Sequence, residues 1–147
     1  MPAKEVLKRA RQDKHEGKAP STQAGEFVRE EIEHIREGKH GARSAKQAIA
    51  IGLSKARRAG VKLPLPKKGS VSEETREQAA RDLRKGKNPR KKTSAKRSRA
   101  MSRVLKREGS SAASELALSR HARSAAAKRS AAARSGSAKQ AAKTRKK

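Results

Sequence analysis

The chain has 147 residues, enough for one modest domain, and its 41 Lys and Arg residues against 14 Asp and Glu residues give a net charge of +27. A domain with this charge repels itself, so its expected partner is a nucleic acid rather than a membrane surface or an acidic protein. The absence of Cys excludes disulfides and thiolate metal sites, and the lack of a long apolar run or a signal peptide predicts a cytoplasmic (nucleoid) protein that does not enter a membrane.

The N-terminal part of the chain carries two helical patterns. Residues 1–20 are expected to form a helix followed by a break, because 3–16 are rich in helix formers and a glycine follows them. In residues 22–37, apolar side chains recur at helical spacing, Ile32 and Ile35 among them. Another glycine ends this second pattern.

Residues 21–66 are predicted to form a helical core module whose clearest element lies at 44–60. Ser44 and Gln47 have the spacing of a capping box at its start. Small residues along its apolar stripe allow another helix to approach closely; they are Ala48, Gly52 and Ala56. Two prolines in 61–66 require an extended segment after the helix.

The rest of the chain is divided into a linking helix at 67–86 and a basic tail at 87–147. Ser70 and Glu73 suggest a capping box for the linking helix. Residues 1–86 hold 21 basic and 12 acidic side chains, whereas the tail holds 20 basic and 2 acidic ones. The sequence therefore predicts an all-α protein with a small, loosely packed helical region and a basic, partly disordered C-terminal half.

The tail nevertheless has helical tendency. Residues 95–107 place Met101, Val104 and Leu105 on one side of a helix, and residues 114–134 continue in helix-forming Ala, Ser and Arg.

Candidate phosphate-binding residues are the Lys and Arg side chains of the 44–60 helix and of the basic runs, since surfaces without binding partners mix charge signs more evenly. They are Arg43, Lys46, Lys55, Arg57, Arg58, Lys67, Lys68, Arg90, Lys91, Lys92, Lys96, Arg97, Arg99, Arg103, Lys106, Arg107, Arg123, Lys128, Arg129, Arg134, Lys143, Arg145, Lys146 and Lys147.

The sequence gives less support to a helix-turn-helix, a metal site or a catalytic site. Ala48 and Gly52 have the spacing of a helix-turn-helix, but the unbroken stripe favours one continuous helix. The four histidines form no His-x-x-x-His pair, and His34 and His40 are separated by Gly38, so we expect solvated or phosphate-facing histidines and no metal site. No phosphate-binding loop or nucleophile motif occurs, so we expect neither an enzyme nor a cofactor.

The motif Lys-Gln-Ala-Ile-Ala-Ile-Gly-Leu-Ser-x-Ala-Arg within residues 43–60 resembles small basic bacterial proteins of a largely uncharacterised family. Residues 95–124 resemble the downstream part of longer members. The Ala/Lys/Arg/Ser tail is similar to those of bacterial histone-H1-like proteins. These resemblances imply a bacterial, cytoplasmic protein and bring no catalytic residues.

The predicted function is binding of nucleic acid through the phosphate backbone without sequence specificity, as in histone-like or nucleoid-associated proteins. Duplex DNA is favoured because Phe27 is the only aromatic residue, and single-strand readers stack bases on several. One alternative is a protein–protein module of a plasmid-maintenance or antitoxin-like system, in which residues 22–60 bind a partner through the acidic group at 30–37. The other is an RNA- or ribosome-associated basic protein.

Overall fold

The computed structural model describes residues 2–88 and 94–145, which fold into seven α-helices and one short 3-10 helix. No strand occurs in these residues, apart from an isolated bridge between Lys68 and Val71, and the all-α prediction is confirmed. None of these helices is long and apolar enough to cross a membrane. The elements are α1 (Lys4–His15), α2 (Pro20–Arg36), α3 (Ala45–Arg58), α4 (Glu73–Lys87), α5 (Ala95–Arg107), η1 (Ser111–Ala113), α6 (Glu115–Ala127) and α7 (Ala131–Arg145).

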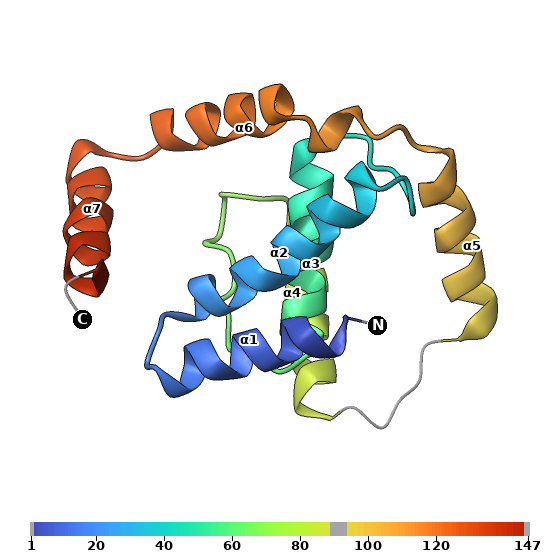
Figure 1. The fold of residues 1–147 in the computed structure, drawn as a ribbon, viewed down its shortest axis with the longest axis horizontal. Coiled ribbons are helices and arrows are strands. Elements are labelled where there is room, and N and C mark those ends of the chain that lie inside the picture. The colour runs from blue at the N-terminus through green and yellow to red at the C-terminus, as the bar shows by residue number, and fades with distance from the viewer. Residues whose placement is uncertain (1, 89–93, 146–147) are drawn as a thin grey trace.

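The first three helices enclose the larger of two apolar clusters. α1 and α2 lie side by side, and α3 crosses behind α2 (Figure 1). The predicted extended segment after α3 returns Val61 and Leu63 to the same cluster. The buried members are Val6, Ala10, Ala24, Phe27, Ala56, Val61 and Leu63. Since only one of these side chains is aromatic, the core is small and depends on close helix–helix contact.

Gly52 makes the close contact between α2 and α3 possible. A Cβ atom at this position would lie 2.6 Å from the Cα atom of Val28. α3 runs unbroken from Ala45 to Arg58 through this glycine, as the apolar stripe predicts, and no helix-turn-helix bend occurs there.

The second cluster joins the C-terminal half of the chain to the helical body. Ile35, Ala42 and Ala48 pack against Ala112 and Ala113 of η1. Ala112 and Ala113 belong to the predicted basic tail, yet they pack against residues of the predicted core module. These contacts therefore cross the predicted domain boundaries.

Backbone hydrogen bonds hold the same junction. The amide of Gly41 donates to the carbonyl of Leu105 at 2.8 Å, and that of Ala42 donates to the carbonyl of Gly109 at 3.1 Å. Gly41 has no space for a side chain, because a Cβ atom would overlap the carbonyl of Glu108.

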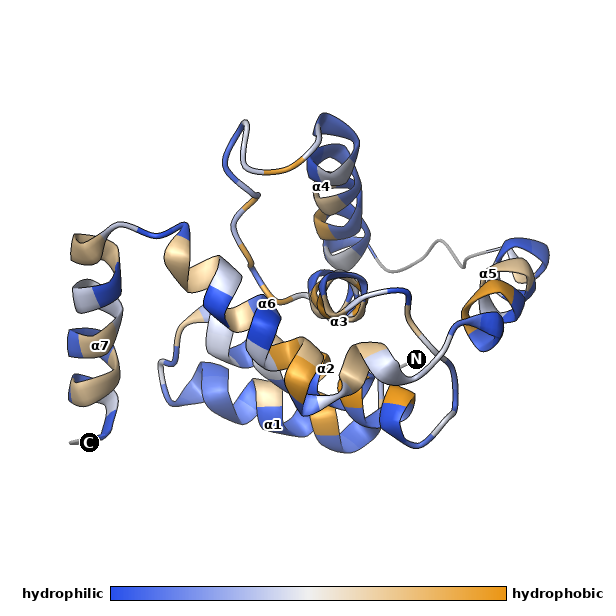
Figure 2. Ribbon diagram, turned by 90° about the horizontal axis from the view of Figure 1, so that it is seen from above, coloured by the Kyte–Doolittle hydropathy of each residue, from blue (hydrophilic) through white to orange (hydrophobic). Residues whose placement is uncertain are grey.

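Beyond this junction, the C-terminal helices surround the body as an open arc. α5 lies at one end, α6 runs along the top and α7 lies at the other end (Figures 1 and 2). Neither α5 nor α7 buries a side chain. The predicted apolar side of α5 therefore does not pack, and Met101 and Val104 are exposed.

Two local predictions need correction. α4 is capped by Ser72, whose hydroxyl accepts from the amide of Thr75, whereas Ser70 donates its hydroxyl to the carbonyl of Lys67. The predicted helix over 114–134 is interrupted at residues 128–130, because α6 ends at Ala127 and α7 begins at Ala131. The predicted partial disorder of the tail stays a prediction.

Substitution of Gly52 tests the close approach of α2 and α3. We expect Gly52→Ala to lower the free energy of unfolding by about 1–3 kcal/mol, because the added methyl group must displace the backbone of α2. Gly25→Ala is the matched control: it also lies within a helix, but the added Cβ has no atom within 4 Å other than those of the adjacent residues and the backbone of its own helix. This control is expected to raise stability by up to about 1 kcal/mol. The free energy of unfolding is measured by urea denaturation. Equal changes in the two variants would contradict the close contact between α2 and α3 at Gly52.

Candidate nucleic-acid interface

Most acidic residues of the body form ion pairs with basic residues of the same part of the chain. Every ion pair that the described residues form takes its basic partner from residues 9–76. Exposed pairs such as Glu37–Lys39 belong to this set, and the hydrogen bond from Lys39 is the main cause that lowers the pKa of Glu37. The charge of the body is thus partly balanced within the fold.

Two buried carboxylates recruit basic residues of α3. Glu31, only 1% exposed, pairs with the ammonium group of Lys55. Asp82 accepts from Arg58 Nε at 2.7 Å and from Ser54 Oγ at 2.6 Å. Since a buried carboxylate is costly without a partner, Lys55 and Arg58 contribute to folding before they can serve a ligand.

Arg57 departs further from the predicted phosphate-binding role. Its side chain is buried, and its Nε atom has no hydrogen-bond partner among the described residues. Burial lowers the pKa of Arg57, and the charge of Asp82 opposes this effect. A guanidinium in this position is not presented to a phosphate.

The basic residues at the start of α3 are exposed and can contact a phosphate. The side chain of Arg43 is 80% exposed, with a single acidic neighbour, Glu108, at 3.8 Å. Lys46 is exposed in the first turn of the helix. Ser44 caps this turn by accepting from the amide of Gln47, and the Gln47 side chain accepts from the amide of Arg43 at 2.7 Å. The predicted capping box is therefore present and fixes the backbone that carries Arg43, although its return bond goes to Arg43 rather than to Ser44.

α5 presents the densest basic surface. It carries six basic and no acidic residues. Four of them recur every three to four residues and line one open hollow together with Ser102; they are Lys96, Arg99, Arg103 and Lys106. This spacing places the four on one face, along roughly 15 Å of helix axis. We call these four residues the α5 stripe.

The remaining predicted residues of the tail are also exposed. Arg97 and Arg107 lie on α5 outside the stripe, Arg123 lies on α6, and the break and α7 carry Lys128, Arg129, Arg134, Lys143 and Arg145. Lys67 and Lys68 are exposed in the segment before α4. Arg90, Lys91, Lys92, Lys146 and Lys147 lie outside the described residues.

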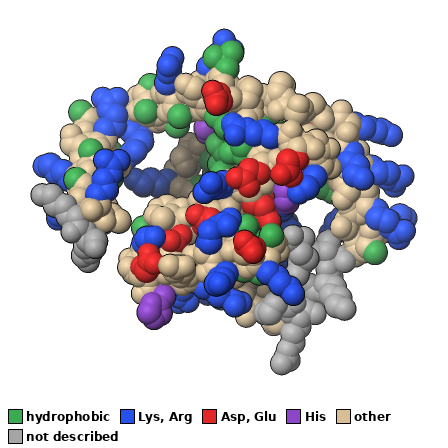
Figure 3. Space-filling view, viewed as in Figure 1, with side chains coloured by type: hydrophobic (Ala, Val, Ile, Leu, Met, Phe, Trp, Pro, Cys, Tyr) green, Lys and Arg blue, Asp and Glu red, His purple; other side chains and the backbone are tan. Residues whose placement is uncertain are grey.

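Acidic side chains are concentrated on the body. In the face shown in Figure 3, they gather over α1 and α2 among basic side chains, whereas the side chains that cover α5 and project from the C-terminal arc are mostly basic. None of the described basic residues of α5, α6 or α7 belongs to an ion pair. The arc therefore carries positive charge that the fold does not balance.

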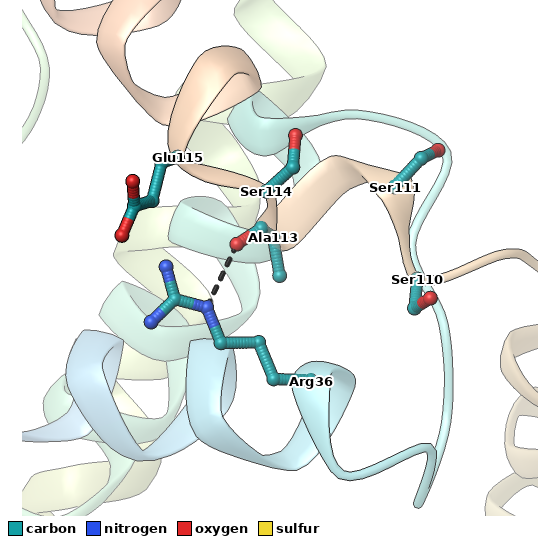
Figure 4. Close-up of a pocket in the computed structure, with 6 residues that line it drawn as sticks. All are labelled: Arg36, Ser110, Ser111, Ala113, Ser114 and Glu115. Carbon is teal, nitrogen blue, oxygen red and sulfur yellow. Dashed lines mark hydrogen bonds between the residues drawn. The ribbon is translucent and has the colours of Figure 1, made fainter.

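A second hollow lies where the tail docks. Arg36 reaches from α2 across to η1, and its Nε atom donates to the carbonyl of Ala113 at 2.9 Å (Figure 4). Glu115 also lines this hollow. Because that carboxylate would repel a phosphate, we interpret the hollow as a structural joint, which the sequence patterns did not predict.

The histidine prediction holds only in part. His15 is exposed, but His34 and His40 come together, with ring centroids 6.2 Å apart in an edge-to-face arrangement. His40 Nε2 lies 2.9 Å from Glu31 Oε1. The expectation of solvated histidines is wrong for this pair, because the turn after α2 folds back onto the helix.

Residues 11–68 match the model of a family described as a family of unknown function (DUF6496). The match covers less than half of the chain and includes the motif of α3. No curated protein and no solved structure matches the chain significantly. The similarity to histone-like tails stays a prediction.

Paired substitutions on α3 separate ligand binding from folding. We expect Arg43→Gln with Lys46→Gln to reduce the slope of log K against log salt for duplex DNA by about 1.8, at 0.9 per phosphate contact, with little change in stability. Lys55→Gln with Arg58→Gln removes the same charge from the C-terminal half of α3 but leaves Glu31 and Asp82 without these cations. This second pair is expected to lower the free energy of unfolding by at least about 2 kcal/mol and to leave the slope unchanged. An equal fall of the slope in both variants would contradict the assignment of Arg43 and Lys46 to phosphate binding and of Lys55 and Arg58 to folding.

Proposed function

We propose that the protein binds duplex nucleic acid, with DNA as the main ligand, through the phosphate backbone and without sequence specificity. The observation that carries the proposal is the unbalanced positive charge of the C-terminal arc, beside a body in which most carboxylates have basic partners of their own. An ordered set of cations without intramolecular partners gains free energy by releasing the counterions condensed on a polyanion.

The chemistry of the arc supports backbone contact over base reading. The α5 stripe consists of Lys and Arg, and Ser102 lines the same hollow. The Asn and Gln side chains that read adenine in the major groove are absent from α5. Contacts of this kind position a protein on the duplex and carry little sequence information.

A ligand with two phosphate strands suits the arrangement. α5 and α7 project at opposite ends of the body, so a single chain offers separated basic helices (Figures 1 and 2). The one aromatic side chain, Phe27, is buried in the larger cluster and stacks on no base. This burial supports a double helix over a single strand as the ligand.

The protein-partner alternative loses much of its basis. Of the four carboxylates that suggested an acidic face, Glu30 and Glu31 are buried, and Glu33 pairs with Arg29 at 3.3 Å on the surface. Duplex RNA presents phosphates of the same charge, and competition between DNA and RNA duplexes of equal length distinguishes the two ligands.

The α5 stripe is tested by replacing Lys96, Arg99, Arg103 and Lys106 with Gln. Loss of four phosphate contacts is expected to reduce the slope of log K against log salt by about 3–4 and to weaken binding at low salt. The measurement is a salt titration of binding to a duplex of about 30 base pairs with nuclease-treated protein.

α1 supplies the matched control. Lys4, Lys8, Arg11 and Lys14 are exposed and have the same helical spacing, so their replacement by Gln removes the same charge from a helix of the body. The proposal predicts a small change of slope in this control. Equal losses in the two variants would show that net charge alone drives binding and would overturn the assignment to the arc.

A further inference from the structure

The turn between α2 and α3 gathers three side chains that bind metals in other proteins. Glu31 and His34 lie one helical turn apart on α2, and His40 follows the helix. One ligand atom of each lies within 4.8 Å of the others. Glu31 is buried and the two histidines are half-buried, so this group is part of the folded body and not a mobile surface cluster.

Gly38 is the residue that brings His40 back to the helix. It adopts a φ of +72°, which favours glycine, and its amide donates to the carbonyl of Ile35 at 3.1 Å. The glycine that separates the two histidines in the sequence is therefore the reason they meet in space.

The hydrogen bonds around the cluster orient its ligand atoms. His40 Nδ1 lies 3.1 Å from the carbonyl of Gly41. His40 Nε2 lies at hydrogen-bond distance from Glu31 Oε1, 2.9 Å. An ion that replaces the proton between these two atoms would have Nε2 as a ligand, while Nδ1 keeps its proton and donates to the Gly41 carbonyl. Glu31 Oε2 is held by Lys55. A histidine held by a backbone carbonyl and a carboxylate held by a second residue are the outer partners that metal ligands normally have.

A neighbouring carboxylate adds an independent observation. Glu30 Oε1 accepts from the amide of Ala3 at 2.7 Å and lies 4.0 Å from His34 Nε2. The other oxygen of this carboxylate is buried and has no hydrogen-bond partner among the described residues. Buried carboxylate oxygens without partners are rare, and a nearby cation would offset the cost.

We infer that Glu31, His34 and His40 form a binding site for a divalent transition metal, with zinc as the expected ion. Two imidazoles and one carboxylate are a ligand set that zinc uses, with a fourth position left for water or for Glu30. A tetrahedral ion with bonds of about 2.0–2.2 Å places its ligands roughly 3.4 Å apart, so small side-chain rotations complete the set. The negative charges of Glu30 and Glu31 offset the charge of the ion.

The site would act on the junction between the body and the tail. His40 immediately precedes Gly41 and Ala42, whose amides hold the carbonyls of Leu105 and Gly109. An ion that fixes residue 40 to α2 also fixes these two donors. The metal would therefore stabilise the attachment of the basic arc, and this role does not depend on whether the arc binds DNA.

The test uses the full chain, freed of nucleic acid and stripped of metal by a chelator. Zinc binding is measured by titration calorimetry, and cobalt(II) replaces zinc to report four-coordinate geometry through its visible absorption. We expect one zinc ion per chain. His34→Gln and His40→Gln are each expected to weaken binding at least about 10-fold, while His15→Gln, on exposed α1, leaves it unchanged.

Circular dichroism is the control that each variant is folded. Hydrogen exchange of the unaltered chain, with and without zinc, is a second measurement. The Gly41 and Ala42 amides exchange when the chain opens locally, and some of these openings separate the ligands of the proposed site. At a zinc concentration about 100 times Kd, exchange through these openings should be about 100-fold slower. Absence of zinc binding in the titration, or zinc binding and amide exchange that do not depend on His34 and His40, would overturn the inference. In that case, His34 and His40 serve only as neighbours of Glu30 and Glu31 in the fold.

Discussion

Buried carboxylates on α2 and α4 decide how the positive charge of this protein is distributed. Glu31 and Asp82 are removed from solvent, and each requires a cation, so half-buried Lys55 and Arg58 of α3 are held against them, although the Arg58 side chain stays 44% exposed. These pairs hold α3 between α2 and α4 in a body that has few large apolar residues. The C-terminal part of the chain carries only two acidic residues, and the described Lys and Arg side chains of its helices stay exposed. The ion pairs balance part of the charge of the body, so the arc carries the larger share of unbalanced charge.

The body and the arc meet at a narrow junction. Backbone donors at Gly41 and Ala42, the apolar contact of Ala112 and Ala113, and the Arg36 hydrogen bond make up most of this connection. α5 and α7 contribute no buried side chain, so little packing restrains their directions. Such an arrangement suits a ligand that is long, uniform and negatively charged, because the helices can follow its surface. It also makes the turn that carries His40 the place where a bound ion would act on the whole arc.

Periodicity and capping patterns predicted the helices well, because each depends on local sequence. Gly17, Gly38 and Gly60 follow their helices with positive φ, as expected for terminating glycines. The fate of individual charges was not predictable in this way. Whether Arg57 faces solvent or the interior depends on where α4 packs, and Arg57 and Arg43 look alike in the sequence. The His34–His40 contact was not predicted, because Gly38 between the two histidines suggested that they lie apart, whereas a terminating glycine with positive φ turns the chain back toward its helix. Two histidines on either side of a terminating glycine are the signal that would have found it.

The central claim is that unbalanced charge on the arc, and not a shape that recognises bases, determines what the protein binds. The most direct test is the affinity of the full chain for several unrelated DNA duplexes of equal length, measured over a series of salt concentrations. The account predicts equal affinities that fall together, with a slope near −7 for about eight phosphate contacts. One strongly preferred duplex, or binding that salt does not weaken, would contradict it.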